Sequence, residues 1–113
     1  SAVPATTNIR PAALLFFDNL ALFYVMTETP QAVLARVFNS AEPRLAGSFL
    51  GLLTGPQRGI MHSLMAAEND TDTRKNQSAL QALLIVADGL AARGLIQKRG
   101  PHFFGLPRPE ETR

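Results

Sequence analysis

The sequence predicts an all-α domain, a compact superhelical stack of about five helices with a short C-terminal β-hairpin or hook. Three observations indicate this. Proline marks several helix starts, and apolar residues recur at helical spacing between those starts. The first four helices are joined by only about two to four residues, which favours a stack. After Gly94 the helical period ends, and the pattern becomes that of short strands.

Composition limits the class of protein. The chain has 113 residues, of which 46% are hydrophobic and 18% charged, so we expect one domain with an apolar surface that meets a partner. The net charge is only +2, but four basic residues and no acids lie between Arg93 and Arg108. The absence of cysteine excludes disulfides and fits a reducing compartment. The longest apolar run, 20–26, is too short to cross a bilayer, so we expect a cytoplasmic protein without membrane insertion.

The expected organisation has three parts. Residues 1–10 form a flexible arm, residues 11–106 form a single helical domain whose hairpin covers 95–106, and residues 107–113 form a frayed tail.

A proline marks the predicted start of each of the first two helices. The first is predicted from Pro11 to about Met26 and is apolar nearly all round, which implies burial on more than one side. Thr29 is expected to cap the second helix with its hydroxyl, while Pro30 fills the first helical position. This helix ends near Phe38. Its apolar face comprises Val33, Leu34, Val37 and Phe38.

The third and fourth helices are separated by Thr54-Gly55-Pro56. Ser40 is expected to cap the third helix. Gly47 and Gly51 lie four residues apart within it, and we expect them to allow close approach by a neighbouring helix. The side chains expected to point inward from the fourth helix are Ile60, Met61, Leu64 and Met65.

A polar segment precedes the fifth helix. Residues 68–76 contain no apolar side chain and are predicted to form a solvated loop, after which Asn76 or Ser78 caps the helix. Gly94 is expected to end this helix in the left-handed conformation, with Leu95 packing back over the last turn. The predicted apolar stripe is Leu80, Leu83, Leu84, Ala87, Leu90 and Ala91.

Two helices begin with the same pair, Pro30-Gln31 and Pro56-Gln57, 26 residues apart. The apolar positions match as well, Leu34 with Ile60 and Phe38 with Leu64. This suggests stacked helical units, although capping chemistry alone would also produce the pattern.

The order of these elements resembles the middle domain of the flagellar motor switch protein FliG, and is similar to the helical domain of MgtE-type magnesium transporters. The family's hallmark is Glu-His-Pro-Gln-Arg at a helix start. Glu28, Pro30 and Gln31 match it, whereas Thr29 replaces the histidine and Ala32 the arginine. The resemblance covers roughly residues 16–96. It implies a non-catalytic domain that binds another rotor protein, FliM in that family, within a bacterial motor or other assembly at the inner face of the membrane.

No catalytic or metal-binding constellation is predicted. His62 and His102 are not at metal-ligand spacing, and no paired carboxylate accompanies either. Glu68, Asp70 and Asp72 alternate as in a calcium loop, but the glycine and the final bidentate acid of an EF-hand are missing. We therefore expect no enzyme activity, cofactor or metal.

The function expected first is protein–protein interaction as a scaffold component, with the oligomeric state left open. Glu28, Pro30 and Gln31 would form one contact. Phe103 and Phe104 would form a second, because adjacent aromatic residues on a hairpin face opposite sides. The alternative for these two rings is that both fold onto the helices.

The rival interpretation is a DNA-binding domain. Residues 90–100 resemble the end of a winged helix, where a helix closes on Gly-Leu-Ile and a basic wing follows. Arg93, Lys98 and Arg99 would then contact phosphates. The preceding helix, at residues 81–87, is too apolar to read base edges, so nucleic acid is expected less than a protein partner.

Overall fold

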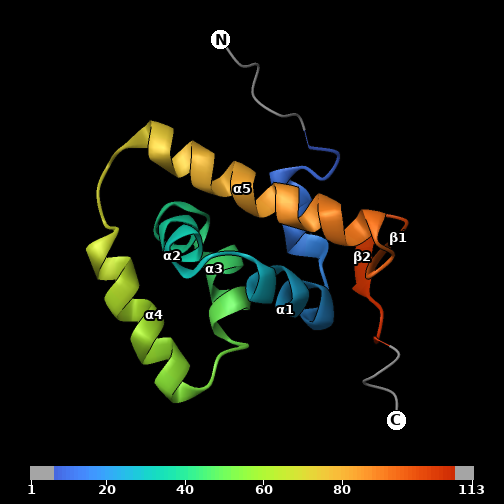
Figure 1. The fold of residues 1–113 in the computed structure, drawn as a ribbon, viewed down its shortest axis with the longest axis horizontal. Coiled ribbons are helices and arrows are strands. Elements are labelled where there is room, and N and C mark those ends of the chain that lie inside the picture. The colour runs from blue at the N-terminus through green and yellow to red at the C-terminus, as the bar shows by residue number, and fades with distance from the viewer. Residues whose placement is uncertain (1–6, 109–113) are drawn as a thin grey trace.

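The computed structural model describes residues 7–108, which form one 3₁₀ helix, five α-helices and a two-stranded antiparallel hairpin (Figure 1). The all-α fold class with a C-terminal hairpin is therefore confirmed. In chain order the elements are η1 (Pro11–Phe16), α1 (Asn19–Glu28), α2 (Gln31–Ser40), α3 (Pro43–Leu50), α4 (Gly55–Ala67), α5 (Thr73–Ala92), β1 (Ile96–Arg99) and β2 (His102–Gly105).

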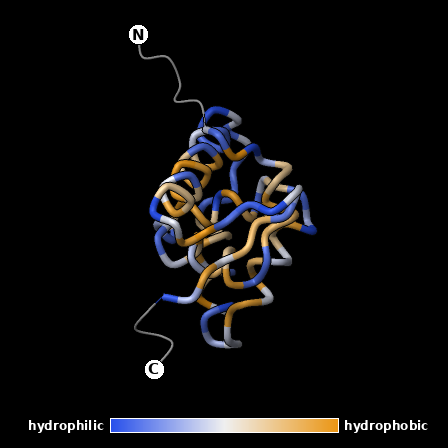
Figure 2. Tube along the Cα trace, turned by 90° about the vertical axis from the view of Figure 1, so that its right-hand side faces the viewer, coloured by the Kyte–Doolittle hydropathy of each residue, from blue (hydrophilic) through white to orange (hydrophobic). Residues whose placement is uncertain are grey.

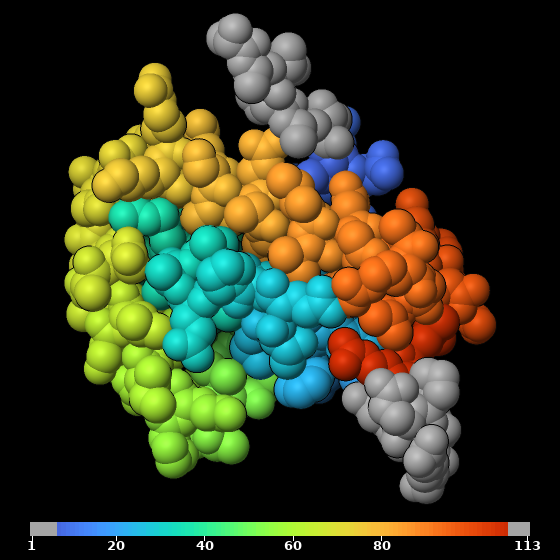
Figure 3. Space-filling view, viewed as in Figure 1, coloured from blue at the N-terminus to red at the C-terminus, as the bar shows by residue number. Residues whose placement is uncertain are grey.

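Helix α2 is the centre of the helical stack. Helix α5 crosses it on one side and α4 packs against it on another, while the hairpin lies against α1 and η1 at the far end of α5 (Figure 1). The space-filling view shows α5, in yellow and orange, lying across α2 and α1, in cyan (Figure 3). This arrangement leaves one face of α1, the start of α2 and the start of α4 open to solvent.

The core draws on every helix and on both strands. Hydrophobic and hydrophilic residues alternate along the helices, as expected where one face of each helix is buried (Figure 2). The side chains with almost no exposed surface are Leu14, Leu22, Tyr24, Val25, Val37, Phe49, Leu83 and Leu90. The expectation that the α1 region is buried on more than one side is confirmed, because α1 packs against α3, α5 and β2.

The predicted first helix is not continuous. Phe17 is extended and forms a parallel bridge with Phe103, and Asp18 then caps α1 through a hydrogen bond of 2.8 Å from the Ala21 N–H to its carboxylate. The same carboxylate accepts from the Gly105 N–H at 2.9 Å, and the Asp18 N–H donates to the Phe103 carbonyl at 2.9 Å. The break therefore attaches β2 to the start of α1.

Two predicted helix caps are wrong for the same reason. The Thr29 hydroxyl donates to the Val25 carbonyl at 2.6 Å, and the Ser40 hydroxyl donates to the Arg36 carbonyl at 2.8 Å. Each hydroxyl thus satisfies a carbonyl four residues back, near the end of the preceding helix, instead of an N–H of the next one. Helix α2 begins at Gln31 with Pro30 as its N-cap residue and no side-chain cap.

The start of α4 agrees with the predicted break. Thr54 and Gln57 form a reciprocal capping box, in which the Gln57 N–H donates to the Thr54 hydroxyl and the Thr54 N–H donates to the Gln57 side chain. Met61 is buried, and Leu64 and Met65 are half-buried. Ile60 is 59% exposed, so its predicted inward orientation is wrong.

Helix α5 begins earlier than predicted and ends where predicted. Asp72 is its N-cap and accepts from the Lys75 N–H at 3.1 Å, so Asn76 and Ser78 lie inside the helix. Gly94 has a φ of +78°, and the Leu95 N–H donates to the Leu90 carbonyl at 3.0 Å. This is the expected glycine terminator.

The close approach expected at Gly47 and Gly51 is wrong. A Cβ at Gly47 would meet no atom within 4 Å, and one at Gly51 would meet only carbonyls of its own helix. The close approach lies at Gly105, where an added Cβ would come within 2.7 Å of the Ala21 nitrogen.

The ends of the described chain are packed. The N–H groups of Asn8 and Ile9 donate to Asp88 at 2.8 and 3.0 Å, and Ile9 is buried, so residues 7–10 are held although we expected a loose arm there. Arg108 lies over the Tyr24 ring, 4.9 Å from its centroid. The rest of the expected arm and tail, residues 1–6 and 109–113, lies outside the described residues.

Candidate functional site

The predicted contact formed by Glu28, Pro30 and Gln31 is divided by the fold. Glu28 is the last residue of α1, and its carboxylate accepts hydrogen bonds of 2.6 and 3.2 Å from Arg93 beyond the end of α5. Arg108 lies 3.6 Å from the same carboxylate. The hydrogen bond from Arg93 is the main reason that the pKa of Glu28 lies below its ordinary value. Glu28 therefore ties α1 to the end of α5.

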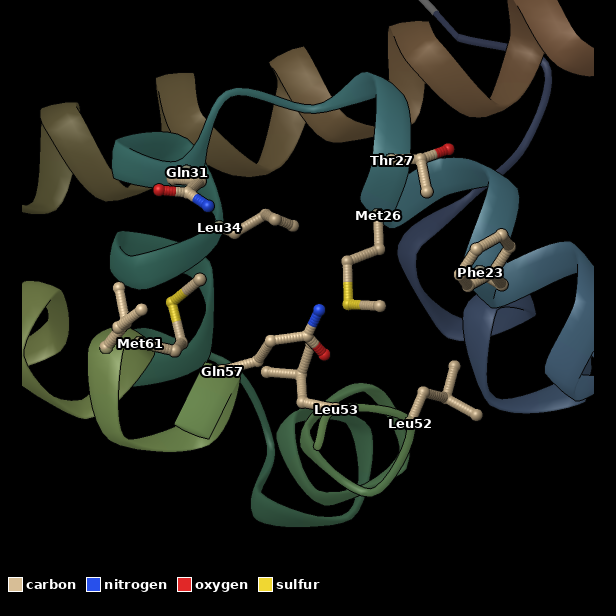
Figure 4. Close-up of a pocket in the computed structure, with 10 residues that line it drawn as sticks. Phe23, Met26, Thr27, Gln31, Leu34, Leu52, Leu53, Gln57 and Met61 are labelled. Carbon is tan, nitrogen blue, oxygen red and sulfur yellow. The ribbon is translucent and has the colours of Figure 1, made fainter. Parts of the chain in front are cut away.

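Gln31 lies at the rim of an apolar groove. The groove has a volume of about 200 Å³ and is enclosed by α1, the start of α2, the segment after α3 and the start of α4. Met26, Leu34 and Gln57 converge on its middle (Figure 4). Pro30 is exposed at the turn that precedes Gln31. The residues that line the groove are Phe23, Met26, Thr27, Gln31, Leu34, Leu52, Leu53, Gln57, Ile60 and Met61.

The lining of this groove is uncharged, and two large apolar side chains in it face solvent. Phe23 is 45% exposed and Ile60 is 59% exposed. Met26 and Met61 add flexible, polarisable side chains, which adapt to partners of different shape. Two large exposed apolar residues in the lining of one groove, together with adaptable methionines, are typical of a binding surface.

Gln57 and most of the other groove residues were not predicted as site residues from the sequence. Gln31 and Gln57 come from the repeated Pro-Gln pair, and the structure places both in the same lining. The repeat was therefore the available signal. The repeat did not identify a binding site, because the capping box of α4 alone accounts for a glutamine at position 57.

The hairpin separates the two predicted aromatic contacts. Strand β1 pairs with β2 in the register Ile96↔Gly105, Gln97↔Phe104, Lys98↔Phe103 and Arg99↔His102. Phe103 is 7% exposed, and its ring centroid lies 4.8 Å from that of Phe17. Phe103 is thus a core residue and not the surface contact we expected. Phe104, on the other face, is 39% exposed.

The basic residues of the hairpin differ in their surroundings. Arg93 is paired with Glu28, and its side chain is 53% exposed. The Lys98 ammonium lies 5.8 Å from the centroid of the Phe103 ring, and Arg99 is exposed beside the turn. One of the three cations of the predicted duplex-binding wing is therefore already paired with an acid.

A buried arginine was not predicted as a key residue. Arg36 is 7% exposed and forms two hydrogen bonds with the Asp70 carboxylate, at 2.8 and 2.9 Å. It also donates to Glu68 at 3.0 Å and to Asn76 at 3.1 Å. These acids lie in the segment we expected to be solvated, and we call the four residues the Arg36 clasp. The clasp fixes the α4–α5 connection against α2.

We predict that the Arg36 clasp makes the free energy of unfolding depend on pH, with lower stability in acid. Hydrogen bonds from Arg36 and from the Asp72 N–H hold the pKa of Asp70 well below its ordinary value. A carboxyl with a lower pKa when folded stabilises the fold above its unfolded pKa, about 3.9, and that contribution is lost as the pH falls. We expect Asp70→Asn to reduce the difference in urea midpoint between about pH 7 and about pH 3.

Glu42→Gln is the matched control for this measurement, since the Glu42 side chain makes no capping hydrogen bond. It should leave the pH dependence close to that of the wild type. Equal pH dependence in the wild type and Asp70→Asn would contradict the assigned role of the clasp.

No group of three or more His, Cys, Asp or Glu side chains within residues 7–108 could hold a metal ion. His62 is exposed on α4, and His102 lies between the rings of Phe16 and Phe104. No helix in the same range is long and apolar enough to cross a membrane.

Comparisons with known proteins do not identify the chain. No protein-family model, curated protein or solved structure matches it.

Proposed function

We propose that this protein is a non-catalytic interaction module whose apolar groove binds the apolar face of a helix from another protein. The single observation that carries this proposal is the groove between α1, α2 and α4, with Phe23 and Ile60 exposed in its lining. Helix-in-groove binding uses a hydrophobic channel between helices of this kind.

The chemistry of the lining favours an uncharged apolar partner surface. A charged side chain placed in this groove would lose water without meeting an opposite charge, because none of the lining residues is charged. The Gln31 and Gln57 side chains provide polar groups at the start of α2 and of α4. A partner helix with an apolar stripe and a polar back matches this distribution.

The resemblance to the middle domain of FliG supports the same function. Gln31 of the matching motif lines the groove, whereas Glu28 pairs with Arg93 at the end of α5. By this resemblance we propose a cytoplasmic place in a bacterial motor or another assembly at the inner face of the membrane. The partner would then be a further protein of that assembly.

The proposal is tested by selection from a phage-displayed library of amphipathic helical peptides. We expect enriched peptides to carry apolar residues at helical spacing and to lose about tenfold or more in affinity with Ile60→Glu. Ile85→Glu on α5 is the matched control, since Ile85 is 48% exposed but does not line the groove. It should leave affinity unchanged.

Three outcomes would overturn the proposal. The library could yield no enriched peptide, the peptides could bind the Ile60→Glu variant as well as the wild type, or light scattering could show a dimer that Ile60→Glu converts to a monomer.

A further inference from the structure

Among the basic side chains of the described chain, three are paired with acids, and the others, which include Arg44, Arg58, Arg74 and Lys75 on α3, α4 and α5, form no ion pair. Arg36 is held by Glu68 and Asp70, and both Arg93 and Arg108 lie against Glu28. In contrast, Arg10, Lys98 and Arg99 form no ion pair with any acid among residues 7–108. Arg10 is the N-cap residue of η1, and Lys98 and Arg99 belong to β1. Both elements lie at the same end of the molecule.

A hollow connects two of these cations. It has a volume of about 270 Å³ and lies between the segment around η1 and the hairpin. Arg10 and Lys98 both line it, together with Phe16 and Pro101, and no acid does. Phe16 is 46% exposed, so one wall of the hollow is an accessible aromatic side chain.

An exposed row of rings continues from this hollow over the outer face of the hairpin. The His102 ring lies between Phe16 and Phe104, with centroid separations of 5.6 and 6.2 Å. Arg99 is the cross-strand partner of His102, so a further cation stands beside the row. We call Arg10, Phe16, Lys98, Arg99, His102 and Phe104 the aromatic-basic face.

We propose that the aromatic-basic face binds single-stranded nucleic acid. A base would enter the hollow against Phe16, and backbone phosphates would contact Arg10, Lys98 and Arg99. Proteins that bind single strands combine such cations with aromatic side chains on which bases stack. The aromatic-basic face shares no residue with the apolar groove. Its binding of single strands is therefore independent of the function proposed above.

The observations favour this ligand over other anions. An acidic peptide would use the three cations but has no planar group for the exposed rings. A lipid surface is flat and would not fill the hollow between η1 and the hairpin. A duplex keeps its bases stacked inside, so the exposed rings of Phe16 and Phe104 would have no free base to stack on.

The test is fluorescence anisotropy of the whole chain with labelled oligothymidylate and oligouridylate. We expect binding that weakens with salt, and a loss of about tenfold with Phe16→Ala. Lys98→Gln should lower the salt slope by about 0.7, the value for one contact with a single-strand phosphate.

The double variant Arg74→Gln with Lys75→Gln is the matched control. It removes two cations at the start of α5, at the opposite end of that helix from the hairpin (Figure 1). It should leave both affinity and salt slope unchanged. Far-UV circular dichroism of each variant checks that the helical fold is retained.

Four results would overturn the inference: no binding to single strands at low salt, equal or tighter binding to a duplex, binding of polyglutamate at similar affinity, or equal effects of the control and Lys98→Gln. Association with phosphatidylserine vesicles that Phe16→Ala abolishes, without binding to oligonucleotides, would assign the face to a membrane instead.

Discussion

Replacing Phe103 with alanine is expected to lower the free energy of unfolding by about 3–5 kcal/mol, the usual cost of removing a buried aromatic ring. The Phe103 ring is 7% exposed and packs against Phe17, where the hairpin meets the chain before α1. The loss should therefore release the hairpin from the helices as well as leave a cavity. Urea denaturation followed by circular dichroism measures this change.

Phe104→Ala is the matched control, because it removes the same side chain from the opposite face of the same strand. Phe104 is 39% exposed, so we expect a loss below about 1 kcal/mol. Similar losses for the two variants would contradict the assignment of Phe103 to the core and of Phe104 to the surface.

The second large effect is expected at Gly105. A Cβ at this position would lie 2.7 Å from the Ala21 nitrogen and 2.8 Å from the Leu20 carbonyl carbon, and both are backbone atoms that cannot turn away. We expect Gly105→Ala to lower the free energy of unfolding by about 1–3 kcal/mol, as overpacked sites do. For a domain of this size that corresponds to a fall in Tm of roughly 4–8 °C per kcal/mol.

Gly47→Ala provides a comparison of opposite sign. A Cβ at Gly47 meets nothing within 4 Å, and the residue is exposed inside α3. The substitution should raise the free energy of unfolding by about 0.4–1 kcal/mol, because alanine restricts the unfolded chain and favours the helix. Thermal unfolding of both variants is the measurement, and destabilisation by Gly47→Ala would show that α3 is packed differently.

Features determined by neighbouring residues were predictable from the sequence. The end of α5 depends on Gly94 and Leu95, and the start of α4 depends on the residues around Pro56, so local pattern was sufficient for both. The hairpin followed from the change of period after Gly94. Its two faces followed from strand geometry, which placed Phe103 and Phe104 on opposite sides.

Features determined by distant residues were not predictable. Whether the Thr29 hydroxyl serves the helix before it or the helix after it depends on which face the turn buries. Arg36 finds its carboxylates 32 and 34 residues further along the chain. Only the fold brings them together, so the polar segment looked like a solvated loop.

The groove is also formed by residues that are distant in the sequence, so it was not predictable. Its lining comes from three helices and from the segment between α3 and α4, and most of its side chains, taken one at a time, are ordinary apolar residues of amphipathic helices. Ile60 is the clearest case. Helical spacing placed it on the inward stripe of α4, yet it is 59% exposed beside the groove. The groove is therefore marked by the exposure of Ile60, which helical spacing predicted to be buried, and by the repeated Pro-Gln pair.

The most direct test of the central claim is a nuclear magnetic resonance titration of the ¹⁵N-labelled chain with a helical peptide selected from the library. If the groove is the docking site, amide shifts should cluster on α1, the start of α2 and the start of α4, around Phe23, Gln31 and Gln57. The amides of β1 and β2 should change little, and Ile60→Glu should remove the shifts. Shifts concentrated on the hairpin or along α5, with the groove amides unmoved, would contradict the claim.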